Sequence, residues 1–274
     1  MPIGTLFKDG VDAYLEEEKD APGAMWFFLH IPKTAGSSFR SELAAALKPN
    51  NNIVIDYKRP DIPFDMQKRA VVDSFIENIH ARPWRFASGH MHYPHVRAIS
   101  EAHGNMRILT MLRDPVKRVI SDYRYQCTPQ HPPHEAFKRE FPTIQDYASS
   151  TASQNKMFSF LAESRREKVE SVIERMDRTF AFVGLLEMYA LSFRLMFTLL
   201  GQRRGPEVYT RKTQDTEANK LSLSDADLAK LRKVNYIDAH IFAHYRRNLV
   251  GVREKLIAKL APRRAAEAHS SPPS

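Results

Sequence analysis

The chain has a single cysteine, Cys127, which excludes an intramolecular disulfide framework. It also has no apolar run long enough to cross a membrane. Glu187 and Arg194 interrupt the apolar residues 185–200, and Gly201 ends them as it would end a buried helix. The first 23 residues contain no signal-peptide core. From these absences we expect a cytoplasmic protein.

Motifs for nucleic-acid recognition are also missing. The sequence has no homeodomain-like or zinc-finger pattern, and its basic residues do not alternate with stacking aromatics. The charge is nevertheless positive, because 41 lysines and arginines against 32 acids give a net charge of +9 and a pI near 9.6. A basic chain favours anionic ligands such as a nucleotide or an acidic glycan. Without a recognition motif, we expect no nucleic-acid partner.

The length and composition fit one folded unit. With 274 residues, of which 43% are hydrophobic, the chain can bury one sizeable core. We expect a single domain over residues 1–261. Residues 262–274 are rich in alanine, proline and serine and predict a disordered tail.

The most informative stretch is an apolar run that ends in a lysine, small residues and hydroxyls. Residues 25–31 predict a strand buried on both faces, and residues 37–47 predict a helix. The loop between them would offer hydroxyls and unpaired helix-start amides to an anion. The residues that would form this cradle are Lys33, Thr34, Ala35, Gly36, Ser37 and Ser38.

This loop differs from the loop of nucleoside triphosphatases. In GxxxxGK[ST] the lysine follows the last glycine, and the next hydroxyl holds magnesium. Here Lys33 precedes Gly36, and the first glycine is missing. For this motif alone, an ordinary strand-to-helix turn with a solvated lysine stays open as the alternative.

A second strand, loop and helix follow. Residues 107–112 predict a buried strand that ends at Arg113, after which Asp114 can cap a helix that Pro115 begins. Ser121 lies two helical turns further on. The planar fork of arginine suits phosphate, so Arg113 and Ser121 could bind one anion. In the alternative, Arg113 pairs with Asp114, and Ser121 is a solvated hydroxyl.

Together the stretches IPKTAGSS and RDPVKRVISDYRY resemble the two nucleotide-binding motifs of sulfotransferases that use 3′-phosphoadenosine 5′-phosphosulfate (PAPS). The likeness is greatest to the heparan sulfate and uronyl 2-O-sulfotransferases and their soluble bacterial relatives. Similar segments of that family correspond to Ser88-Gly89-His90, Gln154-Asn155-Lys156, residues 182–187, and a late helix through Asn235, Asp238 and Tyr245.

The resemblance implies an enzyme that moves a sulfuryl group from PAPS to a hydroxyl of an acceptor, with a glycan or glycolipid as candidates. Lys33 would contact the 5′-phosphosulfate and its bridging oxygen, with the rest of the cradle supplying amides and hydroxyls. Arg113 and Ser121 would hold the 3′-phosphate, and His90 would be the general base. The polysaccharide enzymes usually carry His-Gly-His where this chain has Ser88-Gly89-His90.

Histidine suits the role of base, because its ordinary pKa of about 6.5 lies near the operating pH. His92 is the reserve candidate, and a structural role for His90 stays open. His90, His92 and His95 have no acidic ligand nearby in the sequence, so we expect no metal.

The predicted elements form an α/β, P-loop-like fold of three layers, with a mainly parallel sheet between helices. Its strands are expected at residues 25–31, 53–56, 85–88, 107–112 and 180–185. Lys33, His90 and Arg113 each follow one of these strands, so they should meet at one edge of the sheet.

Three later segments carry further expectations. Residues 126–142 predict an irregular loop or lid on the acceptor side, and residues 202–219 predict a basic loop. Ser224 and Asp227 predict a capping box that begins a long helix reaching Asn248.

Two other functions share parts of these patterns. A P-loop-type nucleotide kinase or other NTPase would have the same sheet and cradle, but it would need a lysine after the glycine and an acid for magnesium. A binder of anionic polymers without enzymatic activity would need only the basic surface.

Overall fold

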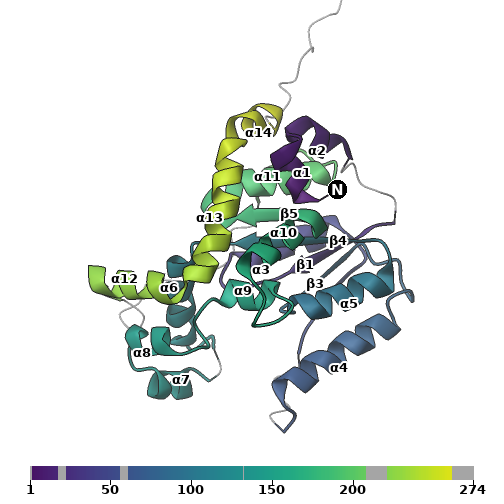
Figure 1. Cartoon of the computed structure of the whole chain (residues 1–274). Coiled ribbons are helices and arrows are strands. Elements are labelled where there is room, and N and C mark those ends of the chain that lie inside the picture. Colours follow the sequence, from purple (N-terminus) through teal and green to yellow (C-terminus); the bar gives the residue numbers. More distant parts are fainter. Residues whose placement is uncertain (1, 18–22, 56–60, 132, 208–220, 261–274) are drawn as a thin grey trace, which may run out of the picture.

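The computed structural model of the chain describes residues 2–17, 23–55, 61–131, 133–207 and 221–260. At its centre lies a parallel five-stranded sheet with the strand order β2-β3-β1-β4-β5 (Figure 1). The strands are β1 (Met25–Leu29), β2 (Asn50–Ile53), β3 (Phe86–Gly89), β4 (Met106–Leu112) and β5 (Phe180–Leu185). The predicted α/β fold, with a parallel sheet between helices, is confirmed.

Helices precede the sheet, fill its connections and form the C-terminal part. Those before β4 are α1 (Ile3–Lys8), α2 (Val11–Glu17), α3 (Gly36–Ala46), α4 (Phe64–Glu77) and α5 (Tyr93–His103). Those between β4 and β5 are α6 (Pro115–Gln126), α7 (His134–Glu140), α8 (Ile144–Ser149), α9 (Lys156–Leu161) and α10 (Val169–Thr179). After β5 come η1 (Leu186–Met188), α11 (Tyr189–Leu199), α12 (Asp225–Val234), α13 (Tyr236–Gly251) and α14 (Arg253–Leu260).

Helices cover both faces of the sheet. Because of a bulge in β5, two phenylalanines of this strand pack against helices on opposite faces. The register with β4 shifts between Ile108 and Leu109, so Phe180 and Phe182 point to opposite faces. Phe182 stacks on Phe39 of α3, with 6.0 Å between ring centroids. Phe180 stacks on Tyr93 of α5, also at 6.0 Å. Figure 1 shows α5, α10 and α13 along the second of these faces.

Strand β2 begins earlier than the sequence predicts. The sequence predicts this strand at residues 53–56, whereas β2 covers Asn50–Ile53, and Asp56 lies outside the described residues. β2 is at the edge of the sheet, where a strand needs fewer apolar side chains. Its Asn52 accepts a hydrogen bond from the Ser88 hydroxyl at 2.9 Å. Side-chain bonding of this kind leaves no hydrophobic pattern in the sequence.

The sequence predicts an irregular loop or lid at residues 126–142, and the irregular loop was wrong. This segment contains α7, whose Phe137 is buried and packs on Tyr123 and Tyr147. These three rings belong to a second hydrophobic cluster between α6, α7, α8 and α12. The segment is therefore a packed part of the fold.

The long helix after Ser224 is two helices. The predicted capping box is present, because the Ser224 hydroxyl accepts from Asp227 N while the Asp227 carboxylate accepts from Ser224 N. The helix then ends at Val234, and α13 begins after Asn235. The predicted buried helix over residues 185–200 is α11 preceded by η1, and Gly201 ends it with a φ of +73°.

Two further predictions concern residues that the structure describes only partly. Of the predicted basic loop, residues 208–219 lie outside the described residues, and so does the predicted tail. Within the described ranges, none of the helices combines the length and the apolar character that a membrane span requires.

Candidate active site at the carboxyl end of the sheet

The chain leaves β1 and β4 toward opposite edges of the sheet. From β1 it passes through α3 to β2, whereas from β4 it proceeds to β5 at the other edge. Open α/β sheets bind ligands at the point where the strand order reverses in this way. The loop after β1 carries Lys33 and the loop after β4 carries Arg113. Nη1 of Arg113 donates a hydrogen bond to the carbonyl oxygen of Lys33 at 3.0 Å, so the two predicted anion motifs are joined.

We call residues 32–38 the cradle loop. Lys33 and Ala35 both have a φ of +69°, in the left-handed region that costs an L-residue about 1 kcal/mol or more. Between them Thr34 is fully buried, and its hydroxyl donates to the carbonyl of Ile31 at 2.9 Å. α3 then begins at Gly36 without a side-chain cap, which leaves its first amides to an anion. Ser37 is exposed there, and Ser38 is buried.

His30 explains the glycine of the cradle loop. A Cβ atom added to Gly36 would lie 1.9 Å from Nε2 of His30, so only glycine fits above this ring. The ring also stacks on Phe28, with centroids 5.1 Å apart. Burial lowers the pKa of His30 well below its usual value, helped by the nearby charges of His90, Arg40 and Lys33. A neutral ring therefore supports the loop from below.

The ammonium group of Lys33 is half-buried next to α6. Its Nζ atom lies 4.0 Å from the centroid of the Tyr125 ring, a cation–π contact. Burial lowers the pKa of Lys33 to about 8, with Asp122 opposing the shift and Arg113 adding to it. Lys33 is thus charged near neutral pH and loses that charge under mildly alkaline conditions.

Arg113 has donors left for a ligand. Its Nη1 is used by Lys33, whereas its buried Nε has no hydrogen-bond partner among the described residues. Asp114 caps α6 through a 3.0 Å bond from Lys117 N, as predicted. Ser121 is half-buried on the same helix, two turns beyond Arg113. The turn that carries Arg113 is therefore fixed through its neighbour, and its guanidinium remains partly free.

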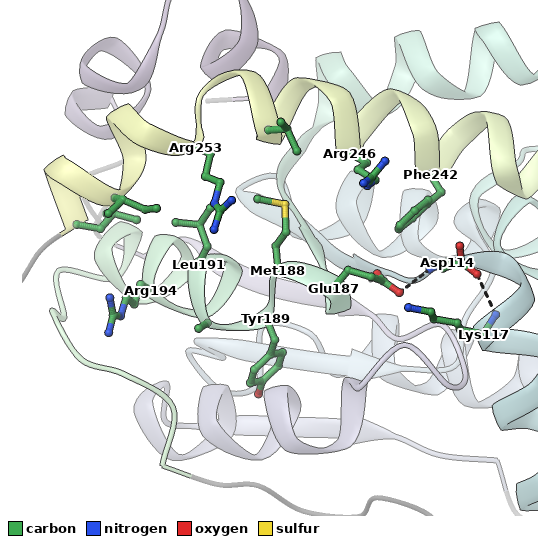
Figure 2. A pocket seen from close by; sticks show the side chains of 14 residues that line it. Asp114, Lys117, Glu187, Met188, Tyr189, Leu191, Arg194, Phe242, Arg246 and Arg253 are labelled. Carbon is green, nitrogen blue, oxygen red and sulfur yellow. Dashed lines mark hydrogen bonds between the residues drawn. The ribbon is translucent and has the colours of Figure 1, made fainter.

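Glu187 fixes this turn from the other side. Its Oε1 accepts a hydrogen bond from the backbone N–H of Asp114 at 3.0 Å. Beyond this bond opens a groove of about 840 Å³, with Asp114, Lys117 and Glu187 at one end (Figure 2). Its walls come from α11, α13 and α14. The groove therefore lies beside the Arg113 turn.

His90 stands directly after β3, next to the cradle loop. Its Nδ1 lies 2.7 Å from the carbonyl oxygen of His30, and the two rings are 4.2 Å apart between centroids. Because a carbonyl only accepts, Nδ1 carries the proton, and Nε2 of the neutral ring has a free lone pair. Partial desolvation lowers the pKa of His90, the bond to His30 opposes this, and Lys156 and Arg40 add to it. His90 is thus neutral at pH 7 and able to accept a proton.

The reserve candidate, His92, has a different environment. β3 ends at Gly89, and His92 is the N-cap residue of α5. Its ring packs edge-to-face on Phe160 at 4.7 Å. Burial lowers its pKa to about 4, with Lys68 and His95 adding to the shift. Over the described ranges, no group of three histidine, cysteine, aspartate or glutamate residues is arranged to hold a metal ion.

The sequence analysis missed the charged face of α6. Arg118 and Asp122 are buried there, and Arg118 Nη1 donates to Asp122 Oδ2 at 3.0 Å. Lys156 approaches the same carboxylate oxygen to 3.9 Å. The spacing of Arg118 and Asp122 by four residues was visible, but such a pair usually lies on a solvated face. The buried Glu42 of α3, which accepts from Arg204 Nη1 at 2.8 Å, was missed for the same reason.

Comparison with known proteins identifies the family. The model of the sulfotransferase family matches residues 22–186, more than half of the chain, and the chain therefore belongs to this family. The matched part includes the cradle loop, His90, Arg113 and Ser121. Family membership places the chain among the enzymes that transfer a sulfuryl group.

Two solved structures are similar to the chain. A sulfotransferase from Alicyclobacillus acidocaldarius is 14% identical with a TM-score of 0.42, over 85% of this chain and 95% of that one. Mouse sulfotransferase SULT7A1, solved in complex with PAP, is 15% identical with a TM-score of 0.38, over 84% of this chain and 66% of that one. The chain thus spans just under two thirds of the mouse protein. Among curated protein sequences, none matches.

The contact between Gly36 and His30 predicts a compensating pair of substitutions. Gly36→Ala should lower the free energy of unfolding by roughly 1–3 kcal/mol, because the added methyl group overlaps the His30 ring. Adding His30→Ala should recover part of this loss, since it removes the overlapped ring. Urea unfolding of both single variants and the double variant measures the coupling.

Gly251→Ala is the matched control, because nothing lies within 4 Å of a Cβ at that position. It should leave the free energy of unfolding unchanged or raise it by up to about 1 kcal/mol, because alanine favours a helix more than glycine does. Strictly additive effects of Gly36→Ala and His30→Ala would contradict the proposed contact.

Proposed function

We propose that this protein is an O-sulfotransferase that takes a sulfuryl group from PAPS and transfers it to a hydroxyl of an acceptor. The observation that carries the proposal is the hydrogen bond from Arg113 to the Lys33 carbonyl. It joins the two anion motifs at the reversal point of the sheet, directly beside His90. Membership of the sulfotransferase family supports the same reaction.

The residues at this edge suit a donor with anionic groups at both ends. The amides of Thr34, Ala35, Gly36, Ser37 and Ser38 and the hydroxyls of the two serines would bind the 5′ end together with Lys33. Arg113, with its unpartnered Nε, and Ser121 would bind the 3′-phosphate. Charged hydrogen bonds of this kind contribute roughly 1.5–3 kcal/mol each.

The chemistry divides between Lys33 and His90. PAPS supplies a sulfuryl group attached to a phosphate oxygen. Lys33 and the helix-start amides would stabilise the negative charge that develops on this oxygen during transfer. Nε2 of His90 would take the proton of the acceptor hydroxyl, since Nδ1 is held by the His30 carbonyl.

For the acceptor we propose a carbohydrate hydroxyl, in a glycan or glycolipid. This choice rests on the resemblance to the polysaccharide 2-O-sulfotransferases. Ser88 stands where those enzymes usually have their first histidine, and here it is fully buried and bonded to Asn52. His90 would therefore act without a second histidine from this segment.

Substitution of His90 tests the assignment of the base. His90→Ala should reduce the turnover of sulfate transfer from labelled PAPS to glycan acceptors by about 10²–10⁴. Its affinity for adenosine 3′,5′-bisphosphate should stay close to that of the parent, because the ring does not hold the nucleotide. The parent's rate should rise with pH through a pKa below 6.5. The control is His240→Ala, an exposed histidine of α13. Normal turnover in His90→Ala would remove this residue from the mechanism.

The low pKa of Lys33 predicts how nucleotide binding depends on pH. As the pH rises through about 8, Lys33 loses its charge, so the affinity for adenosine 3′,5′-bisphosphate should fall. In Lys33→Arg the charge persists at every accessible pH, so this loss of affinity should be smaller. Isothermal titration between about pH 7 and about pH 9 measures both. An equal pH dependence in the two proteins would show that Lys33 does not face the nucleotide.

A further inference from the structure

The start of α9 is held in place by α13, from a distant part of the sequence. Asp238 is fully buried and accepts hydrogen bonds from Met157 N at 2.9 Å and Phe158 N at 2.7 Å. In return, Oδ1 of Asn155 accepts from Ile237 N at 3.0 Å and from Asp238 N at 3.2 Å. Each helix thus caps the other. Lys156, the first residue of α9, lies between the capping contacts and has a fixed backbone.

The side chain of Lys156 points to the buried carboxylate of α6. Asp122 Oδ2 already accepts from Arg118 Nη1 and from the Tyr147 hydroxyl, both at 3.0 Å. Lys156 Nζ is 3.9 Å from the same oxygen, which is an ion pair but too long for a hydrogen bond. Asp122 therefore attracts the ammonium group without using its donors.

Lys33 approaches the same face of α6. Its ammonium group lies over the Tyr125 ring, and Tyr125 is three residues beyond Asp122. Side chains three residues apart are neighbours on a helix, with roughly 5–6 Å between Cβ atoms. Two lysines from distant segments thus bring their ammonium groups to one short stretch of α6, beside the cradle loop.

Positive charge is in excess at this place. Arg118, Lys33 and Lys156 face the single carboxylate of Asp122, and Asp238 is turned toward the amides of α9. Burial lowers the pKa of Lys156, with Asp122 opposing the shift and Arg118 adding to it. Lys156 also lowers the pKa of His90 by its charge, so its ammonium group acts on the proposed base. An anionic group between Lys33, Lys156 and His90 would balance this charge.

We propose that Lys156 is a second catalytic lysine, whose ammonium group binds the sulfuryl oxygens of the donor opposite Lys33, and that Asp122 is its positioning residue. This inference rests on the proposed function. During transfer, the bond from sulfur to the phosphate oxygen breaks and the bond from sulfur to the acceptor oxygen forms. The acceptor proton goes to His90. Lys156 donates hydrogen bonds throughout and keeps its own protons.

Comparing two ligands separates this role from general nucleotide binding. Adenosine 3′,5′-bisphosphate lacks the sulfuryl group that PAPS carries. Lys156→Met should therefore leave the affinity for adenosine 3′,5′-bisphosphate within about threefold of the parent's. It should lower the turnover of transfer from PAPS by about 10²-fold, the usual effect of removing one donor to developing charge. Lys156→Arg, which keeps the charge, should recover part of the turnover.

The matched control is Lys168→Met, at the exposed N-cap of α10, which should match the parent in both assays. Thermal unfolding shows whether each variant is folded, and Lys156→Gln replaces the methionine variant if that one is not.

Turnover within about threefold of the parent's in a folded variant would overturn the role of Lys156 and leave the proposed function intact. Equal losses of turnover and of bisphosphate affinity would also overturn it, because Lys156 would then support the cradle. A parent that transfers no sulfate from PAPS would overturn the proposed function, and this inference with it.

Discussion

The candidate site depends on the position of His30. Its ring occupies the space below Gly36, and its carbonyl oxygen fixes Nδ1 of His90. One residue thus sets both the shape of the cradle loop and the tautomer of the proposed base. His30 can do this beside Lys33 and Arg40 because its lowered pKa keeps it neutral. A charged imidazole at this place would repel the cations that an anionic ligand needs.

The site combines backbone strain with buried charge. Lys33 and Ala35 hold left-handed conformations that cost free energy, and the hydrogen bond from Arg113 to Lys33 is one of the contacts that maintain them. On α6, Asp122 is buried with Arg118 and Tyr147 around it. Buried ion pairs contribute little to stability, because desolvation offsets most of their attraction. Under the proposed function, the energetic benefit of both features lies in binding and orienting an anion.

The predictable parts of this structure are those with a local cause. Asp114 and Pro115 predicted the start of α6, and Ser224 and Asp227 predicted the start of α12. Four of the five strands were predicted from apolar runs in the sequence. The placement of Lys33, His90 and Arg113 at one edge followed from those strands. The chemical roles assigned to these residues stay predictions.

The unpredictable parts depend on contacts between distant residues. The break at Asn235 follows from mutual capping with Asn155, some eighty residues earlier, and Asn235 Oδ1 itself accepts from Asn155 N at 2.9 Å. The buried face of α6 carries Arg118 and Asp122, which in the sequence resemble an exposed ion pair. The pairing of β2 with β3 includes a side-chain hydrogen bond from Ser88 to Asn52. None of these contacts leaves a hydrophobic pattern in the sequence.

The central claim is that the cradle loop and Arg113 bind the nucleotide of PAPS. Calorimetric titration of the intact protein with adenosine 3′,5′-bisphosphate in magnesium-free buffer tests it most directly, with ATP and magnesium titrated in parallel. We expect the bisphosphate to bind at one site without magnesium and more tightly than ATP does. Binding of ATP with magnesium but not of the bisphosphate would contradict the account and favour a nucleotide kinase or another NTPase. Binding of neither would contradict it as well and favour a binder of anionic polymers.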